Sequence, residues 1–280
     1  VKGRFNFDEV RYTYYSEAEV MFRDFLAGHI DFRLEDDPKR WATDYELPPV
    51  RDGRIVRESV PIALPAGMSA LVFNARRPVF ADRTVRRALI HAFDGDRINR
   101  TLYHGLYTRT ESYFDRSYLA SRGRPADERE RSLLAPWLDR LAPGILEGRY
   151  RIPGSAGAIR ENLRTAVDLL GASGYAARGG RLTSTRTGEP LAFEILTRSR
   201  QQERLVSAYA DDLRRLGIVV TLRLVDSTQY QERLRKYDFD MIQTTWHTSL
   251  SPGNEQTNRF GSASAGIERS FNWAGVRDPA

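Results

Sequence analysis

The stretch Leu191–Trp246 constrains the fold more than any other part of the chain, because strand and helix patterns alternate along it. It predicts, in order, a strand at Leu191–Leu196, a helix with the apolar residues Leu205, Tyr209, Leu213 and Leu216, a strand at Ile218–Leu224, a short helix with Tyr230 and Leu234, and a strand at Phe239–Thr245. Gly217 is placed to end the first helix, and Asp226 to cap the second. Such alternation predicts crossover connections and a mostly parallel sheet covered by helices. Ligands of such sheets bind beyond the carboxyl ends of the strands, which points to the loop after Thr245.

The rest of the chain predicts further elements, which we list in order. The first are a strand at Val10–Tyr14, a helix capped by Ser16 and Glu19 and ended by Gly28, and a strand at Ile30–Phe32. A strand at Met68–Asn74, a helix begun by Asp82 and a short helix capped by Asp96 follow. Arg116–Pro153 is expected to be an extended loop or insertion with a short helix, and it contains one apolar island at Leu133–Leu138. The last are an amphipathic helix with Ile159, Leu163, Val167 and Leu170, and a hairpin over Leu182–Leu196 that turns at Thr187–Pro190.

Composition excludes several classes of protein. The chain has no cysteine, which excludes disulfides and thiolate chemistry, and its apolar runs are too short for a membrane span. All but three of its 43 basic residues are arginine, but acidic residues are interleaved with them, as at Asp127–Arg131. This patterning disfavours a nucleic-acid partner. The chain begins with Val1 and carries no signal peptide, so we expect it to be a piece of a longer protein.

Several stretches resemble one known family. Phe7–Phe32, Leu71–Asn99 and Leu213–Met241 are similar to the recognisable segments of the family 5 extracellular solute-binding proteins of bacterial ABC transporters. Gly105–Phe114, Ala158–Leu170 and Ser249–Gln256 resemble the YejA-like subgroup of its oligopeptide binders.

The resemblance implies an α/β fold with two lobes, of the type II periplasmic-binding-protein class, in which a mixed, mostly parallel sheet is covered by helices. Residues 1–66 are then expected to be the end of the first lobe, and residues 67–280 the second lobe, incomplete at its C-terminus. The implied function is capture of oligopeptides or peptide-like solutes in the periplasm by lobe closure, and their delivery to an inner-membrane ABC permease. The implied protein is a monomer and not an enzyme.

One departure from the family concerns the peptide amine. In oligopeptide binders of this family, a carboxylate in the loop after the last strand receives the amino terminus of the peptide. Here that loop contains no Asp near Trp246, and the nearest acid is Glu255. Glu255, backbone carbonyls or hydroxyls would then receive an amine, and a ligand with a blocked or absent amine is equally allowed.

The expected ligand-binding residues are mostly polar or aromatic. They are Asn74, Tyr113, Gln229, Gln243, Trp246, Ser249, Ser251, Asn254, Glu255 and Gln256. Each has a structural alternative: Trp246 as core, the 249–256 loop as an exposed turn set by Pro252 and Gly253, the glutamines as solvent-exposed, and Asn74 as a residue that orients backbone. Phe114 is a second candidate pocket residue beside Tyr113, and Arg160 a candidate partner for a ligand carboxylate or a surface residue.

The sequence offers little support for catalysis. The four histidines are scattered without metal-ligand spacing, and Gly261–Gly266 does not match a nucleophile elbow. We therefore expect no catalytic residue, no metal and no cofactor. Three alternatives stay open: a binder of a non-peptide solute on the same fold, a hydrolase in which His247 would bond to Ser249 or Ser251, and a nucleic-acid binder, which would need the arginines gathered on one face.

Overall fold

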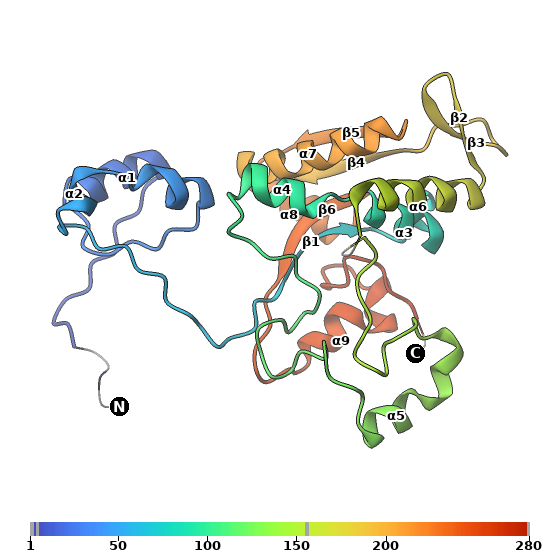
Figure 1. Ribbon diagram of the computed structural model, residues 1–280, viewed down its shortest axis with the longest axis horizontal. Coiled ribbons are helices and arrows are strands. Elements are labelled where there is room, and N and C mark those ends of the chain that lie inside the picture. The colour runs from blue at the N-terminus through green and yellow to red at the C-terminus, as the bar shows by residue number, and fades with distance from the viewer. Residues whose placement is uncertain (1–2, 4–5, 155–156, 279–280) are drawn as a thin grey trace. The chain divides into compact units, whose positions relative to one another are not determined.

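The computed structural model describes residues 3, 6–154 and 157–278. The chain divides into two compact units, Val1–Val60 and Pro61–Ala280 (Figure 1). Each unit is described by itself below. The division falls close to the expected boundary between residues 66 and 67.

The larger unit is built on a four-stranded mixed sheet. Its strands are β1 (Met68–Phe73), β4 (Ala192–Thr197), β5 (Val219–Leu224) and β6 (Met241–Trp246), in the order β1-β6-β4-β5. β4 is parallel to both β5 and β6, whereas β1 is antiparallel to β6. The predicted α/β fold with a mostly parallel sheet is therefore confirmed, as are the three strands predicted between Leu191 and Trp246 and the strand predicted from Met68.

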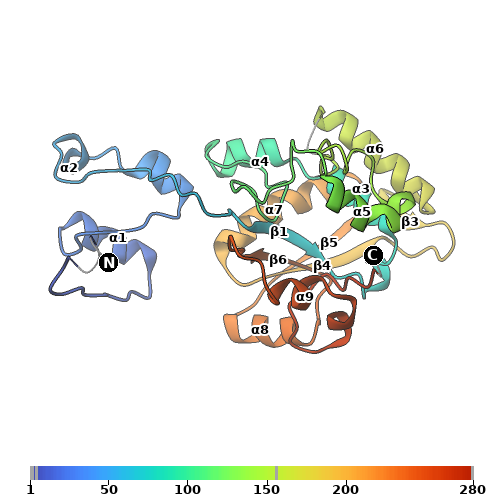
Figure 2. The same cartoon turned by 90° about the horizontal axis from the view of Figure 1, so that it is seen from below.

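Helices cover both faces of this sheet (Figure 2). The helices of the unit are α3 (Arg83–His91), α4 (Gly95–Leu102), α5 (Glu128–Leu134), α6 (Ile159–Ala172), α7 (Arg200–Arg215), α8 (Ser227–Arg235) and α9 (Glu255–Phe260). α3, α6 and α7 pack on one face, and α8 packs on the other. Gly217 ends α7 at a φ of 81°, and Asp226 caps α8 by accepting the amide of Gln229 at 2.9 Å, as predicted.

Each face of the sheet has its own apolar core. On the α7 face, Phe80 and Phe193 stack edge to face at 5.0 Å, and the fully buried Tyr209 donates its hydroxyl to the carbonyl of Leu89 at 2.7 Å. On the α8 face, Ile242 and Trp246 pack with Tyr230 and other residues of α8. The two cores follow from the period-2 alternation along the strands.

A second, two-stranded sheet precedes β4. It pairs β2 (Tyr175–Arg178) with β3 (Arg181–Ser184). The predicted turn at Thr187–Pro190 is present, since the amide of Ser184 donates to Glu189 and the amide of Leu191 to Leu182, each at 2.8 Å. The sequence predicted a hairpin over Leu182–Leu196 but did not predict that β3 pairs with β2. The expected second strand of that hairpin, β4, belongs to the four-stranded sheet.

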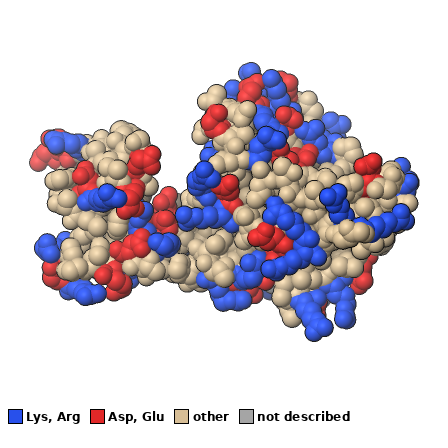
Figure 3. All heavy atoms as spheres, turned by 90° about the horizontal axis from the view of Figure 1, so that it is seen from above, with Lys and Arg blue, Asp and Glu red and all other residues tan. Residues whose placement is uncertain are grey.

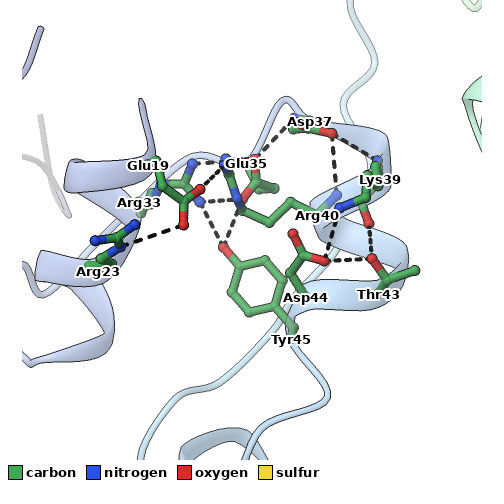
Figure 4. Close-up of polar contacts among 10 residues, drawn as sticks. All are labelled: Glu19, Arg23, Arg33, Glu35, Asp37, Lys39, Arg40, Thr43, Asp44 and Tyr45. Atoms are coloured by element: carbon green, nitrogen blue, oxygen red, sulfur yellow. Dashed lines mark hydrogen bonds and ion pairs between the residues drawn. The ribbon is translucent and has the colours of Figure 1, made fainter. Parts of the chain in front are cut away.

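The smaller unit is organised around a buried charge cluster. It contains α1 (Ala18–Leu26), a π-helical turn (Arg40–Asp44) and α2 (Pro48–Arg51). Arg33 and Glu35 form an ion pair whose side chains are only 3% exposed, and the hydroxyl of Tyr45 donates to Glu35 at 2.9 Å (Figure 4). Burial raises the pKa of Tyr45, and its hydrogen bond to Glu35 raises it further. Phe22 of α1 stacks edge to face on Tyr45 at 5.3 Å.

Two strands predicted in the smaller unit are wrong. Val10–Tyr14 and Ile30–Phe32 form no strand in the described part of the chain. Tyr12 and Phe32 are each 76% exposed, and Val60 and Ile62 farther along are also exposed. The alternation predicts one buried face for such segments, but a strand needs neighbours that the described residues do not supply.

Two predicted caps are wrong as well. α1 has Glu17 at its N-cap without a side-chain hydrogen bond, and Glu19 pairs with Arg40 at 3.1 Å. α4 is capped by Asp94, whose carboxylate accepts the amide of Arg97 at 2.9 Å, so Asp96 lies in the first turn. The short helix near Leu133 and the amphipathic helix α6 are confirmed.

Charge is distributed in both signs over the surface shown in Figure 3, where acidic side chains lie among the basic ones. Ion pairs such as Arg200–Glu203 and Lys236–Glu232 account for part of this pattern. Among the described residues, no helix combines the length and apolarity that a bilayer crossing requires.

Candidate ligand-binding site

The parallel strands of the larger unit end at one edge of the sheet. The carboxyl ends of β4, β5 and β6 are Thr197, Leu224 and Trp246. Because β1 is antiparallel to β6, its first residue, Met68, pairs with Trp246 at the same edge. This edge is the place where a sheet of this kind binds ligands.

A glycine permits the close approach of two chain segments at this edge. Gly67 has a φ of 71°, and a Cβ at this position would lie 2.5 Å from the carbonyl oxygen of Trp246. Only glycine combines this conformation with this contact. A larger residue at position 67 would displace the backbone at Trp246 and His247, where the loop after β6 begins.

The loop at residues 247–254 is held by its own polar groups and by the segment before α5. The hydroxyl of Thr248 donates to the carbonyl of Tyr113 at 2.8 Å, and that of Tyr118 donates to Leu250 at 3.3 Å. The hydroxyl of Ser249 donates a hydrogen bond to the carbonyl of Ser251 at 2.9 Å and accepts one from the backbone amide of Ser251 at 3.2 Å. These bonds give the loop a defined conformation.

The far end of the loop carries the acid nearest to Trp246. The carboxylate of Glu255 accepts the amide of Gly253 at 2.9 Å and the side-chain amide of Gln256 at 3.2 Å. The hydrogen bond from Gly253 holds the pKa of Glu255 below its usual range. Glu255 is therefore ionised at neutral pH, while Ser251 and Asn254 are exposed beside it.

Aromatic rings surround Trp246. The Tyr113 ring lies 5.8 Å from Trp246 and 4.9 Å from Phe260, and the Phe260 ring lies 6.4 Å from Trp246. The Trp273 ring lies 5.5 Å from Trp246. Burial raises the pKa of the Tyr113 hydroxyl, whereas the charge of Arg259 acts to lower it.

A cavity of about 530 Å³ opens beside these rings. Tyr113 and Trp246 line it, together with β1 residues from Met68 to Phe73 and the segment 274–278. The volume lies in the range of small-molecule sites. The structure thus brings Trp246, Tyr113 and the loop 249–256 to one end of the sheet, and of these Trp246 and Tyr113 line the cavity.

The two expected glutamines lie apart from this cluster. Gln229 is exposed in the first turn of α8. Gln243 precedes Trp246 by three residues, so its side chain points to the opposite face of the sheet, where its oxygen Oε1 is buried without a hydrogen-bond partner.

Asn74 lies at the other end of the sheet. It follows the last residue of β1, and a six-residue strand spans roughly 20 Å. Its side chain is fully buried and donates to the carbonyls of Tyr237 and Phe239 at 3.0 and 2.9 Å. In this structure Asn74 orients backbone, which was the alternative reading of the sequence.

Arg160, Phe114 and His247 make no contact in the described part of the chain that indicates ligand binding or catalysis. Arg160 is exposed on α6, and Phe114 is half-buried beside Tyr113. No hydrogen bond joins His247 to Ser249 or Ser251 in the described part of the chain, and the Ser249 hydroxyl is engaged by Ser251. Within residues 3, 6–154 and 157–278, no cluster of acidic and histidine side chains could hold a metal ion.

Two aromatic neighbours of Trp246 were missed by sequence reasoning. Phe260 belongs to α9, and Trp273 lies in the segment after it. The predicted site stopped at Gln256, although aromatic residues in the following turns were a usable signal.

The fold and this site place the chain among known proteins. The model of the family described as bacterial extracellular solute-binding proteins, family 5, matches residues 1–267. The chain therefore belongs to this family of solute-binding proteins.

Individual relatives agree with this assignment. The chain is 43% identical to a putative binding protein of Brucella melitensis, over 100% of this chain and 46% of that protein. It is 40% identical to the probable peptide-binding protein YejA of Agrobacterium fabrum, over 99% of this chain and 46% of that protein. The chain spans about half the length of these curated relatives.

A solved structure shows the same fold. The oligopeptide-binding protein AppA of Bacillus subtilis, in complex with a nonapeptide, matches with a TM-score of 0.67 at 18% identity, over 94% of this chain and 45% of that one. The relatives named here are described as binding proteins, in agreement with the family of solute-binding proteins.

Proposed function

We propose that the complete protein captures a peptide or peptide-like solute in the periplasm and delivers it to an inner-membrane ABC permease. The observation that carries the proposal is that Trp246, the last residue of β6, lines a cavity of about 530 Å³ and is followed by the polar loop 249–256 at the carboxyl ends of the parallel strands. The printed descriptions of YejA and AppA, which name peptides, support the same class of ligand.

The proposed mechanism is closure of two lobes around the ligand. Residues 1–66 belong to the first lobe and residues 67–280 to the second, and ligand contacts with both lobes stabilise the closed state. Hydroxyls and amides of the 249–256 loop bond the peptide main chain, and ionised Glu255 is placed to receive a free amine. The complete protein acts as a monomer, and this chain alone binds ligand weakly or not at all because it carries part of the cleft.

Calorimetry of the full-length protein with short peptides tests the proposal. Ser251→Ala combined with Asn254→Ala removes two exposed side chains for which the described residues show no side-chain hydrogen bond. We expect this variant to bind peptide at least about tenfold more weakly, since it loses hydrogen bonds to the ligand. Arg186→Gln, in the exposed turn before β4 at the opposite edge of the sheet, is the control and should bind like the parent protein.

Native mass spectrometry of the full-length protein identifies the solute directly. A co-purifying peptide supports the proposal. A sugar or a metal chelate, with no affinity for any peptide, would instead establish the alternative of a non-peptide solute.

A further inference from the structure

The chain enters the larger unit through a weakly held stretch. Residues 58–65 span the boundary between the two units, and in the described part of the chain none of them donates or accepts a hydrogen bond. Ile62 and Leu64 are each more than half exposed. Ala66 is the first anchored residue, since its amide donates to the carbonyl of Asp115 at 2.8 Å. Asp115 therefore lies at the point where the incoming chain is attached to the larger unit.

Asp115 belongs to a turn at residues 111–118 that is held by its own polar groups. The carboxylate of Asp115 accepts the amide of Glu111 at 2.7 Å. The hydroxyl of Ser117 donates to the carbonyl of Phe114 at 2.7 Å. These bonds give the turn a defined conformation, in which the positions of its backbone carbonyls are fixed relative to one another.

The same turn holds the ligand loop, residues 247–254. The hydroxyl of Thr248 donates to the carbonyl of Tyr113, two residues before Asp115. The hydroxyl of Tyr118 donates to a carbonyl farther along the loop. The turn is therefore bonded to the incoming chain at one carbonyl and to the ligand loop on either side of it.

The incoming chain also touches the start of the ligand loop directly. Gly67 follows Ala66, and its close approach to the carbonyl of Trp246 leaves no room for a Cβ. The end of the incoming chain, the turn 111–118 and the ligand loop therefore contact one another in a closed ring. Because packed contacts rearrange in discrete steps, a displacement of one of these segments requires the others to move with it or the contacts to break.

We propose that the turn 111–118 couples the ligand loop to the hinge between the lobes. Residues 58–65 take up the lobe movement, since they have no hydrogen bonds to break, and Ala66 passes it to the turn. The ligand loop then takes its binding position as the lobes close, and a ligand that holds the loop favours closure. Asp115 and Thr248 are positioning residues, which act on the ligand through the loop. This inference rests on the proposed function and names how the same site is regulated.

The test compares affinity and lobe closure in the full-length protein. Calorimetry measures the affinity for dialanine, trialanine and pentaalanine, and the tightest binder serves as the probe. Small-angle X-ray scattering with and without saturating probe measures closure as a decrease in the radius of gyration. A purely structural contact would change the melting temperature but not the decrease at saturation, so the scattering separates coupling from stability.

Two variants open the link at different contacts. Thr248→Val removes the hydroxyl that holds the loop, and Asp115→Ala removes the carboxylate that holds the turn. We expect each to weaken probe binding by about threefold to tenfold, the range of one lost hydrogen bond. Each should also reduce the decrease in the radius of gyration to less than about half of that in the parent protein. Because both variants interrupt one link, the double variant should bind within about twofold of the weaker single variant.

Controls separate the link from general effects of substitution. Thr221→Val, on an exposed position of β5, is the matched control and should keep the affinity and the full decrease in the radius of gyration. Ser117→Ala removes a bond inside the turn and is a milder second variant, which should act in the same direction as Asp115→Ala. Thermal melting confirms that each variant is folded at the temperature of the assay.

The outcomes distinguish the link from the proposed function. If the parent protein binds the probe and closes, but either Thr248→Val or Asp115→Ala keeps its affinity and closure, the link alone is overturned. Additive losses of affinity in the double variant would also overturn it, because they would show two separate effects. If none of the three peptides binds the parent protein, the proposed peptide function fails, and the link fails with it.

Discussion

The guanidinium carbon of Arg76 lies 3.8 Å from the centroid of the Tyr237 ring. The same guanidinium donates to the carbonyls of Ala265 at 2.7 Å, Asn272 at 2.8 Å and Trp273 at 3.2 Å. Burial lowers the pKa of Arg76, but the group has enough acceptors to remain a cation. Arg76 therefore ties the end of β1 to the last segment of the described chain.

We expect Arg76→Met to lower the free energy of unfolding by about 3 kcal/mol, because it leaves several buried carbonyls without a donor. Urea denaturation measures this loss. Arg87→Met on the exposed side of α3 removes an arginine without such contacts and should cost less than about 0.5 kcal/mol. Equal losses in both variants would contradict the role given to Arg76.

Arg97 neutralises a buried acid. Its nitrogen Nη2 donates to Asp212 at 2.6 Å, and burial raises the pKa of Asp212. Arg97→Met should cost about 2 kcal/mol near pH 7, since Asp212 then stays buried as a charge with weaker compensation. The cost should shrink between pH 7 and pH 4, because protonation of Asp212, whose pKa burial raises, removes the charge that Arg97 compensates. Arg200→Met breaks the exposed Arg200–Glu203 pair and should cost less than about 0.5 kcal/mol at both pH values.

Burial of the His91 imidazole predicts that the larger unit loses stability in mild acid. Burial lowers the pKa of His91, the contact with Asn162 raises it, and the charges of Arg87 and Arg109 lower it. An unfolded histidine titrates near 6.5. Below that pH, the unfolded chain binds a proton more readily than the folded chain, so stability falls as the pH drops from 6.5 toward the folded pKa.

We therefore expect His91→Gln to flatten the fall in the urea midpoint between pH 7.5 and pH 5.5. His247→Gln changes an exposed histidine and is the control, which should follow the parent protein. A steeper fall in His91→Gln than in the parent would have the wrong sign and refute the argument.

Gly67 should be intolerant of substitution because its neighbour is the backbone of Trp246. Gly67→Ala places a Cβ 2.5 Å from that carbonyl at a φ of 71°. We expect a loss of stability of about 2 kcal/mol and weaker peptide binding by the full-length protein, because the loop after β6 must move.

Gly171→Ala provides the opposite result as a control. No atom lies within 4 Å of a Cβ at Gly171 in α6, so the substitution should stabilise the protein by up to about 1 kcal/mol. Thermal melting of the two variants separates a specific clash at Gly67 from a general effect of replacing glycine.

Local patterns predicted the larger unit well. The alternation from Leu191 to Trp246 lies within one chain segment, and its strands find their partners inside the unit. The strands expected at Val10–Tyr14 and Ile30–Phe32 failed because periodicity predicts a buried face but not the neighbour that covers it. The hairpin expected over Leu182–Leu196 is a similar case. β3 pairs with β2 and meets the segment before β4 in the Thr183–Pro190 bridge, whereas β4 itself pairs with β5 and β6.

The candidate site was predictable in position and only partly in composition. The carboxyl-edge rule led to Trp246 and its loop, and the structure places Tyr113 beside them. The rule did not lead to Phe260 and Trp273, because their contacts with Trp246 depend on how the chain after the loop folds back. Asn74 follows the end of β1 as expected, but it lies at the opposite end of the strands from Trp246.

The position of β1 at the border of the sheet has a practical consequence. In the described chain this strand has a neighbour on one side only, and five of its residues line the cavity of about 530 Å³. Exposed backbone of this kind recruits extended segments of other molecules, and self-association at high concentration is the usual result. A purified preparation of these 280 residues should therefore scatter more light as it is concentrated, and a lysine in place of Ala70 should suppress that growth.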